Sequence, residues 1–317
     1  EMDVALYVAN LAVNTVIIAT DIVVIYITIK TKEIAEKLIL WTIFLCMGFD
    51  IAAFLNTIIH DVPSYIMDED LYKTPEPAYL SALSIVLQWY SQLFALLVLS
   101  VLHFIAAFYP TNFRTISLRH MHMINLFIVL VSILLAVPMF TPWCGYSYSI
   151  QSHNWFFDLS KPYSYVWWIW NIVLQTICAV VMAGADVAII WKIRVLRIAV
   201  TKRKQISSSH PTANSVTETR TQREQRTQRI NREIRLAINF LLLSACFLIM
   251  TIAWNLPLRQ EMWYDLFLKF TTNLNLSKWA IYTLGNAKIR QGFLRLCRCR
   301  QTGTLTTVTV VKILPTR

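Results

Sequence analysis

Ionisable side chains inside long apolar stretches are the residues of this sequence with the clearest chemical meaning, because a charge there is costly and usually functional. Asp21, Asp50 and Lys278 lie deep in such stretches. Asp186 and Lys269 lie nearer the ends, where a side chain can reach water. A buried carboxylate must be protonated, paired or hydrated. We therefore expect the deep trio to face the interior of a helix bundle, where it could form a paired network or a path for protons or ions.

The apolar stretches that hold these residues are long enough to cross a membrane. Of the 317 residues, 56% are hydrophobic and 15% are charged, whereas a soluble domain carries about 25% charged residues. A membrane-crossing helix needs roughly 20 apolar residues. The predicted spans are residues 6–29, 38–60, 79–105, 121–142, 165–191, 236–257 and 264–284. The predicted fold class is all-α integral membrane: a seven-transmembrane helix bundle with a short amphipathic helix after the seventh span.

The distribution of basic residues supports the seventh span, which is the least apolar. Basic residues gather on the cytoplasmic side of membrane proteins. With seven spans, 24 of the 29 Lys and Arg residues lie on one side, whereas six spans would place the basic tail outside. We therefore predict an outside N-terminus and a cytoplasmic C-terminus. The net charge of +11 then faces the anionic inner leaflet, and no nucleic-acid partner is needed to explain it.

The chain is expected to form one membrane domain, residues 1–300, followed by a cytoplasmic tail, residues 301–317. The only long loop, 192–235, is cytoplasmic in this topology, and its Ser- and Thr-rich middle is typical of disorder. Arginines then follow at every third position from Arg220 to Arg235, a step that circles a helix instead of lining one face. This pattern favours a solvated extension of the sixth helix.

The cysteines and histidines indicate neither a disulfide framework nor a metal site. Of the six cysteines, only Cys144 faces the outside, so it has no extracellular partner in the chain. Cys297 and Cys299 follow the seventh span in a basic stretch and are either palmitoylation sites or ordinary solvated thiols. The six histidines fall on different loops and depths, so we predict no enzyme, no metal and no cofactor.

Several motifs share one register with a known receptor family. "CMGFD" places Asp50 in the second span, "LHFIAAFYP" contains His103 near the end of the third, and "KWAIYTLGNAKIR" begins at Lys278 in the seventh. Together with the seven spans, these segments resemble the rhodopsin-like G-protein-coupled receptors. In that family the motifs are Leu-Ala-x-x-Asp, Asp-Arg-Tyr and Asn-Pro-x-x-Tyr, so that His103 replaces Arg, Lys278 replaces Asn, and Tyr282 is retained.

Two longer segments are similar to one branch of this family. "WYSQLFALLVLSVLHFIAAFYP" and "CGYSYSIQSHNWFFDLSKPY" resemble the nematode serpentine chemoreceptors of class x. The resemblance implies a chemosensory receptor in the plasma membrane, with the sensory cilium as its more specific location. An extracellular small molecule would shift the helix bundle, which would engage a heterotrimeric G protein. The usual bridge from the third span to the second outer loop cannot form, because no Cys lies at the outer end of that span.

The resemblance also implies roles for individual residues. The ligand pocket would lie between the outer halves of spans three, five, six and seven, and its candidate residues are Trp89, Trp168, Asn171, Trp254 and Asn273. For the tryptophans, packing or the interfacial aromatic belt is the alternative.

The inner half of the bundle would carry the activation machinery. His103 would face the G protein and pair with Glu233 at the foot of the sixth helix; a simply solvated His103 is the alternative. An activation network would comprise Asp21, Asp50, Lys278 and Tyr282, with the Lys278 ammonium in place of a bound sodium ion. Lys278 reaching toward the cytoplasmic surface is the alternative here.

A transporter or channel is the second reading of the same charges. Asp21, Asp50 and Lys278 could line an ion or proton path through the bundle. The sequence has no inverted repeat and no pair of Gly- or Pro-broken helices, which are typical of transporters. The receptor is therefore the favoured interpretation.

Overall fold

The computed structural model describes residues 2–36, 38–72, 75–149, 154–209, 241–254 and 262–299. For some of these residues, including Lys278, Tyr282, Cys297 and Cys299, it describes the backbone and not the side chain. Glu233 and the tail 301–317 lie outside the described residues.

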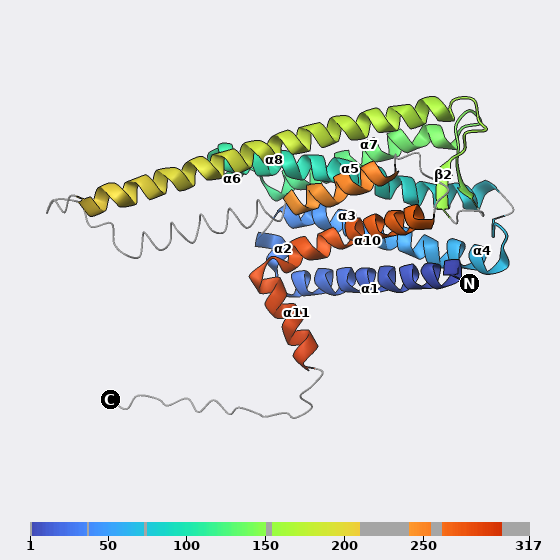
Figure 1. Ribbon diagram of the computed structural model, residues 1–317, viewed down its shortest axis with the longest axis horizontal. Coiled ribbons are helices and arrows are strands. Elements are labelled where there is room, and N and C mark those ends of the chain that lie inside the picture. Colours follow the sequence, from blue (N-terminus) through green and yellow to red (C-terminus); the bar gives the residue numbers. More distant parts are fainter. Residues whose placement is uncertain are drawn as a thin grey trace.

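In this described part of the chain, seven long helices run side by side (Figure 1). They are α1 (Met2–Lys30), α3 (Ile39–Asn56), α5 (Pro75–Phe108), α7 (Leu118–Ala136), α8 (Ser164–Ser209), the helix Leu241–Trp254 and α10 (Met262–Leu284). Long apolar runs with only six glycines in the whole sequence favour this outcome, because a helix satisfies its own backbone hydrogen bonds in an apolar medium. Among the described residues, five helical segments are long and apolar enough to cross a membrane. The chain is therefore a multi-pass membrane protein.

Short elements connect the helices. They are α2 (Glu33–Glu36), the π-helix η1 (Thr57–Asp61), α4 (Val62–Met67), α6 (Pro110–Arg114), the 3-10 helix η2 (Val137–Phe140), strands β1 (Tyr146–Ser149) and β2 (Asn154–Phe157), and α11 (Ala287–Cys299). The strands form an antiparallel hairpin in which Tyr146 faces Phe157 and Ser149 faces Asn154. The predicted amphipathic helix after the seventh span is present as α11, which confirms that part of the fold class.

The two ends of the bundle differ. The N-terminus, α4 and the hairpin lie at one end, called the hairpin end below, and α2, α6 and α11 lie at the other (Figure 1). Helix α5 is central. Half of its most apolar stretch is buried inside the protein, whereas at most 28% of the corresponding stretch is buried in each of the other four candidate spans. The buried apolar core accordingly gathers around Leu93, Leu96 and Leu99 of this helix.

At the α11 end, two contacts fix the turn from α10 into α11. The Glu33 carboxylate of α2 is buried and accepts from Lys288 Nζ at 2.6 Å and from Asn286 Nδ2 at 3.0 Å. Helix α11 then passes close to α1, where an added Cβ on Gly292 would lie 2.6 Å from Ile27 Cγ2. Any larger residue at position 292 would force the Ile27 side chain to shift, so glycine favours this close approach.

The structure departs from the sequence-based expectation in two places. The segment 192–235 was expected to be a loop from its first residue, yet α8 continues as a helix to Ser209 and projects beyond the bundle (Figure 1). The apolar run of the fifth span passes directly into polar residues without Gly or Pro, so nothing ends the helix at residue 191. The structure also contains the β1–β2 hairpin, which the expected all-α architecture does not include.

Candidate functional site

A cavity of about 930 Å³ lies among the helices at the hairpin end. Its wall combines residues of α1, α3, α5, α8, the helix Leu241–Trp254 and α10, and residues of β2 also contribute. This volume is in the range of small-molecule sites, roughly 300–1,000 Å³. The cavity extends from the hairpin down to Asp50 in the middle of α3.

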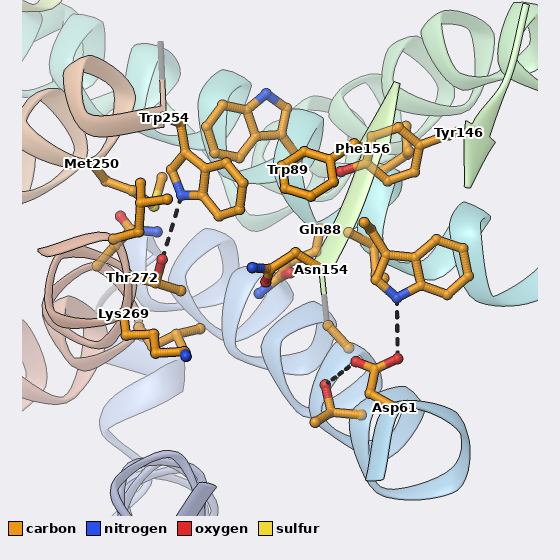
Figure 2. A pocket seen from close by; sticks show the side chains of 18 of the residues that line it. Asp61, Gln88, Trp89, Tyr146, Asn154, Phe156, Met250, Trp254, Lys269 and Thr272 are labelled. Atoms are coloured by element: carbon orange, nitrogen blue, oxygen red, sulfur yellow. Dashed lines mark hydrogen bonds between the residues drawn. The ribbon is translucent and has the colours of Figure 1, made fainter. Parts of the chain in front are cut away.

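Aromatic side chains form the wall beneath the hairpin. Phe156 of β2 lies against Trp254, with ring centres 6.1 Å apart, and Trp89 of α5 lines the same wall (Figure 2). Trp254 Nε1 donates to Thr272 Oγ1 of α10 at 3.4 Å. These contacts join the hairpin, the helix Leu241–Trp254 and α10 at one point, so a ligand there would touch all three.

The floor of the cavity is a polar network around Asp50. The Asp50 carboxylate is only 1% exposed and accepts from Gln88 Nε2 at 2.5 Å and also from Gln92 Nε2. Gln92 Oε1 in turn accepts from Asn275 Nδ2 at 3.1 Å. The network therefore joins α3, α5 and α10 in the centre of the bundle, and it stabilises a buried carboxylate with hydrogen bonds.

A second polar group, the hairpin-end cluster, consists of His60, Asp61, Asp70, Thr57 and Trp155. His60 is fully buried, and its Nδ1 and Nε2 lie 2.8 Å from Asp61 Oδ1 and 2.9 Å from Asp70 Oδ1. Both ring nitrogens can donate only in the imidazolium form, which this geometry suits. Asp61 also accepts from Trp155 Nε1 at 3.1 Å and from Thr57 Oγ1 at 3.1 Å (Figure 2). Through Trp155 the cluster ties β2 to η1.

Ring contacts complete this cluster. The His60 ring stacks on Tyr72, with centres 4.4 Å apart, and meets the edge of Tyr148 at 4.9 Å. Burial, followed by the nearby Asp61 carboxylate, raises the pKa of the Tyr148 hydroxyl. The hydroxyl is therefore neutral at physiological pH, and the hairpin packs its aromatic face on the cluster.

Hydrogen bonds also hold the segment that leads into the hairpin. Lys161 Nζ donates to the Cys144 carbonyl at 3.1 Å, and the Gly145 amide donates to Ser164 Oγ at 3.0 Å. Cys144 is a buried free thiol. Burial raises the pKa of this thiol, and the neighbouring Lys161 ammonium partly opposes that effect. Cys144 is therefore protonated and poorly reactive.

We predict that the hairpin needs no disulfide. Dithiothreitol and the substitution Cys144→Ser should each leave the thermal unfolding midpoint unchanged within about 1 °C, because a structural bridge would contribute about 2–4 kcal/mol. Differential scanning fluorimetry of the purified chain measures this midpoint. A drop of several degrees with the reductant would instead reveal a bridge from Cys144 to another cysteine.

The structure brings four of the five predicted ligand-site residues together. Trp89, Trp168, Asn171 and Trp254 line the cavity. Asn273 does not line it: its Nδ2 donates to Asn10 Oδ1 at 2.9 Å and joins α10 to α1. Successive side chains of a helix point in different directions. Asn273 therefore points to α1, whereas Thr272 and Asn275 reach the cavity.

The other predicted site residues are placed only in part. Asp21 is 0% exposed, and His103 is half-buried near the end of α5. The side chains of Lys278 and Tyr282, the candidate lipidation sites Cys297 and Cys299, and all of Glu233 lie outside what the structure describes.

Sequence reasoning did not select several side chains of the cavity. Gln88 and Gln92 lie four residues apart on an apolar helix, a spacing that places both on one face. That spacing was a usable signal, but uncharged amides were not counted among the costly groups. Asp61 and Lys269 also line the cavity; Lys269 was assigned to a helix end, and Asp61 to no site.

Known proteins share the fold of the chain but not its sequence. No protein-family model and no curated protein matches the sequence. Among solved structures, the chain is similar to the crystal structure of squid rhodopsin, with a TM-score of 0.61, 14% sequence identity, and coverage of 94% of this chain and 87% of that chain. The chain therefore shares the seven-helix fold of rhodopsin, as the sequence predicts.

Proposed function

We propose that the chain is a G-protein-coupled receptor of the chemosensory kind, which binds an extracellular small molecule in the cavity and transmits this event to a heterotrimeric G protein. The observation that carries the proposal is the aromatic-walled cavity of about 930 Å³ at the hairpin end of a rhodopsin-like fold. The similarity of two segments to nematode serpentine chemoreceptors supports the sensory role. In this proposal the hairpin end faces outside, at the plasma membrane or the sensory cilium.

Binding of a ligand in this cavity could change the structure at the opposite end of the bundle through contacts between helices. It would touch Trp254 and Thr272, and so bias the helix Leu241–Trp254 against α10. A ligand shifts a two-state bundle only by its difference in affinity for the two states, and typical coupling between sites is about 1–3 kcal/mol. At the far end, Lys192 Nζ of α8 donates to the Ala107 carbonyl and lies 4.3 Å from the centre of the Phe108 ring. Movement there would reach His103, proposed here to face the G protein and pair with Glu233.

The test compares two tryptophans in cells that express the full chain. A small-molecule library is screened with a calcium readout through a co-expressed G protein, and the responses of variants are then measured with an N-terminal tag reporting surface level. For an active compound, Trp254→Ala should raise the half-maximal concentration at least about tenfold, because a buried aromatic anchor contributes 2 kcal/mol or more. Trp191→Ala is the matched control, since Trp191 is 64% exposed on α8 and lies outside the cavity.

Three outcomes would contradict the proposal. Equal loss of response in both variants at equal surface level would show that the ligand does not signal through the cavity. Charge-coupled flux through the reconstituted chain without a G protein, or a tag within residues 192–235 that antibodies read on intact cells, would favour a transporter instead.

A further inference from the structure

Lys269 is a cationic side chain of the cavity wall. It lies on α10, one turn before Thr272, and both residues line the cavity. In Figure 2 its ammonium extends from α10 toward the open centre of the cavity. Within the part of the chain that the structure describes, Lys269 makes no ion pair and no hydrogen bond. A strongly hydrated ammonium in such a place attracts an anion.

Neither carboxylate of the cavity makes a described ion pair with Lys269, and other donors bind both of them. Asp50 is held by Gln88 and Gln92 at the floor. Asp61 is held by His60, Thr57 and Trp155 in the hairpin-end cluster. The cavity therefore presents two occupied anions and one cation without a bonded partner among the described residues.

The other residues of the cavity wall indicate what the uncharged part of an anionic ligand would be. Trp89, Trp168, Trp254 and Phe156 line the same space. Aromatic rings stack on one another in offset or edge-to-face arrangements worth about 0.5–1.5 kcal/mol per pair beyond the buried area. An aromatic ligand gains from this wall, whereas an amine would meet the Lys269 ammonium with the same sign of charge.

We propose that the cavity is a site for an aromatic carboxylate, whose carboxylate group binds Lys269 and whose ring packs between Trp89, Trp254 and Phe156. This inference rests on the proposed function only in taking the cavity as the ligand site. It makes Lys269 the residue that determines specificity for an acid over its amide or amine.

The experiment uses three probes with one ring system and different charges: indole-3-acetate, indole-3-acetamide and tryptamine. The full chain is reconstituted in nanodiscs of zwitterionic phosphatidylcholine, and the thermal midpoint is followed against probe concentration, which yields an apparent Kd. Indole-3-acetate should bind at least about tenfold tighter than indole-3-acetamide, since a hydrogen bond to a charged group contributes about 1.5–3 kcal/mol. Tryptamine should bind weakest.

Variants of Lys269 test whether this residue causes the difference in affinity between the acid and the amide. Lys269→Gln should bring the acid to within about twofold of the amide, and Lys269→Arg should retain the preference. Asp265→Asn is the matched control, because Asp265 is the acid one turn earlier in the sequence of α10; it should leave the preference intact.

Three results would overturn the proposal. They are an acid preference that survives Lys269→Gln, tighter binding of tryptamine than of indole-3-acetate, and no midpoint shift with the acid at millimolar concentration. The binding readout needs no G protein, so a failure here leaves the signalling test unaffected. Conversely, loss of signalling with intact acid binding would contradict only the receptor proposal.

Discussion

Replacing Asp61 with alanine should lower the free energy of unfolding by about 3–5 kcal/mol, because it removes one partner of the buried His60–Asp61 pair. The same substitution removes the acceptor of Trp155 Nε1 and of Thr57 Oγ1. Trp155 is 7% exposed, so its indole N–H cannot turn to water. The hairpin would thus lose its attachment to η1. Thermal unfolding of the purified chain measures the loss, and hydrogen exchange at Tyr146–Ser149 and Asn154–Phe157 measures the release of the hairpin.

Asp70 supplies the matched control, since it contacts the other nitrogen of the same ring. The side chain of Asp70 is 36% exposed against 12% for Asp61, and water can replace an exposed carboxylate. Asp70→Ala should therefore cost about 1 kcal/mol or less. Equal losses for the two substitutions, or unchanged hydrogen exchange in the hairpin after Asp61→Ala, would show that His60 and Trp155 do not depend on the Asp61 carboxylate.

The sequence predicts the helices well because the membrane imposes one simple rule on them. A run such as 121–142 must be helical to satisfy its backbone hydrogen bonds in an apolar medium, and α7 with η2 covers Leu118–Phe140. The hairpin follows no such rule. Its strands have four residues each, and the segment between them, "IQSH", carries none of the usual two-residue turn signals.

The contacts that hold the hairpin are also distant in the sequence. Trp155 and Asp61 are 94 residues apart. Asp61 is the last residue of the π-helix η1, whose wider turn changes the direction of its side chain relative to a regular α-helix. Pro63 in "NTIIHDVPS" indicates a disturbed helix but does not specify a π-helix, so this part of the site required the structure.

Within the cavity, the structure places side by side several of the residues that the sequence analysis proposed as a ligand site. Trp89, Trp168 and Trp254 were selected from the register of the third, fifth and sixth spans, and all three line the cavity. Asn273 lies one position after the cavity residue Thr272, and this single helical step turns its side chain to α1. Span boundaries predicted from hydropathy do not fix the rotation of a helix about its own axis.

Removing the ammonium of Lys278 is the second change expected to have a large effect. We propose that Lys278 neutralises the buried carboxylates Asp50 and Asp21, which are 1% and 0% exposed. Lys278 follows Asn275 by three residues on α10, a spacing that puts both on one face of the helix. Asn275 donates to Gln92, which donates to Asp50. The position of Lys278 in the sequence of α10, three residues after this member of the network, is what supports the proposal.

Lys278→Met should destabilise the protein by about 3–5 kcal/mol, because it deletes the cation of a buried ion pair and leaves the carboxylates uncompensated. A loss of this size is a large fraction of the whole stability of a typical protein. We therefore expect Lys278→Met to be retained inside the cell. Surface labelling of an N-terminal tag, normalised to total protein, measures this effect. Lys269→Met is the matched control, since it removes a lysine two turns earlier on α10 that makes no described ion pair, and its surface level should stay normal.

The double variant Lys278→Asn with Asp21→Asn separates charge balance from packing. It removes one cation and one anion together, so the buried charge returns to a single carboxylate, Asp50, that Gln88 and Gln92 already bind. Surface expression should then recover relative to Lys278→Met, although neither native side chain is present. Recovery would require the two residues to act as one electrostatic unit, because distant independent substitutions add their losses. A normal surface level and thermal midpoint for Lys278→Met alone would instead mean that the ammonium reaches water at the α11 end and that Asp50 is stabilised by its amide partners without a cation.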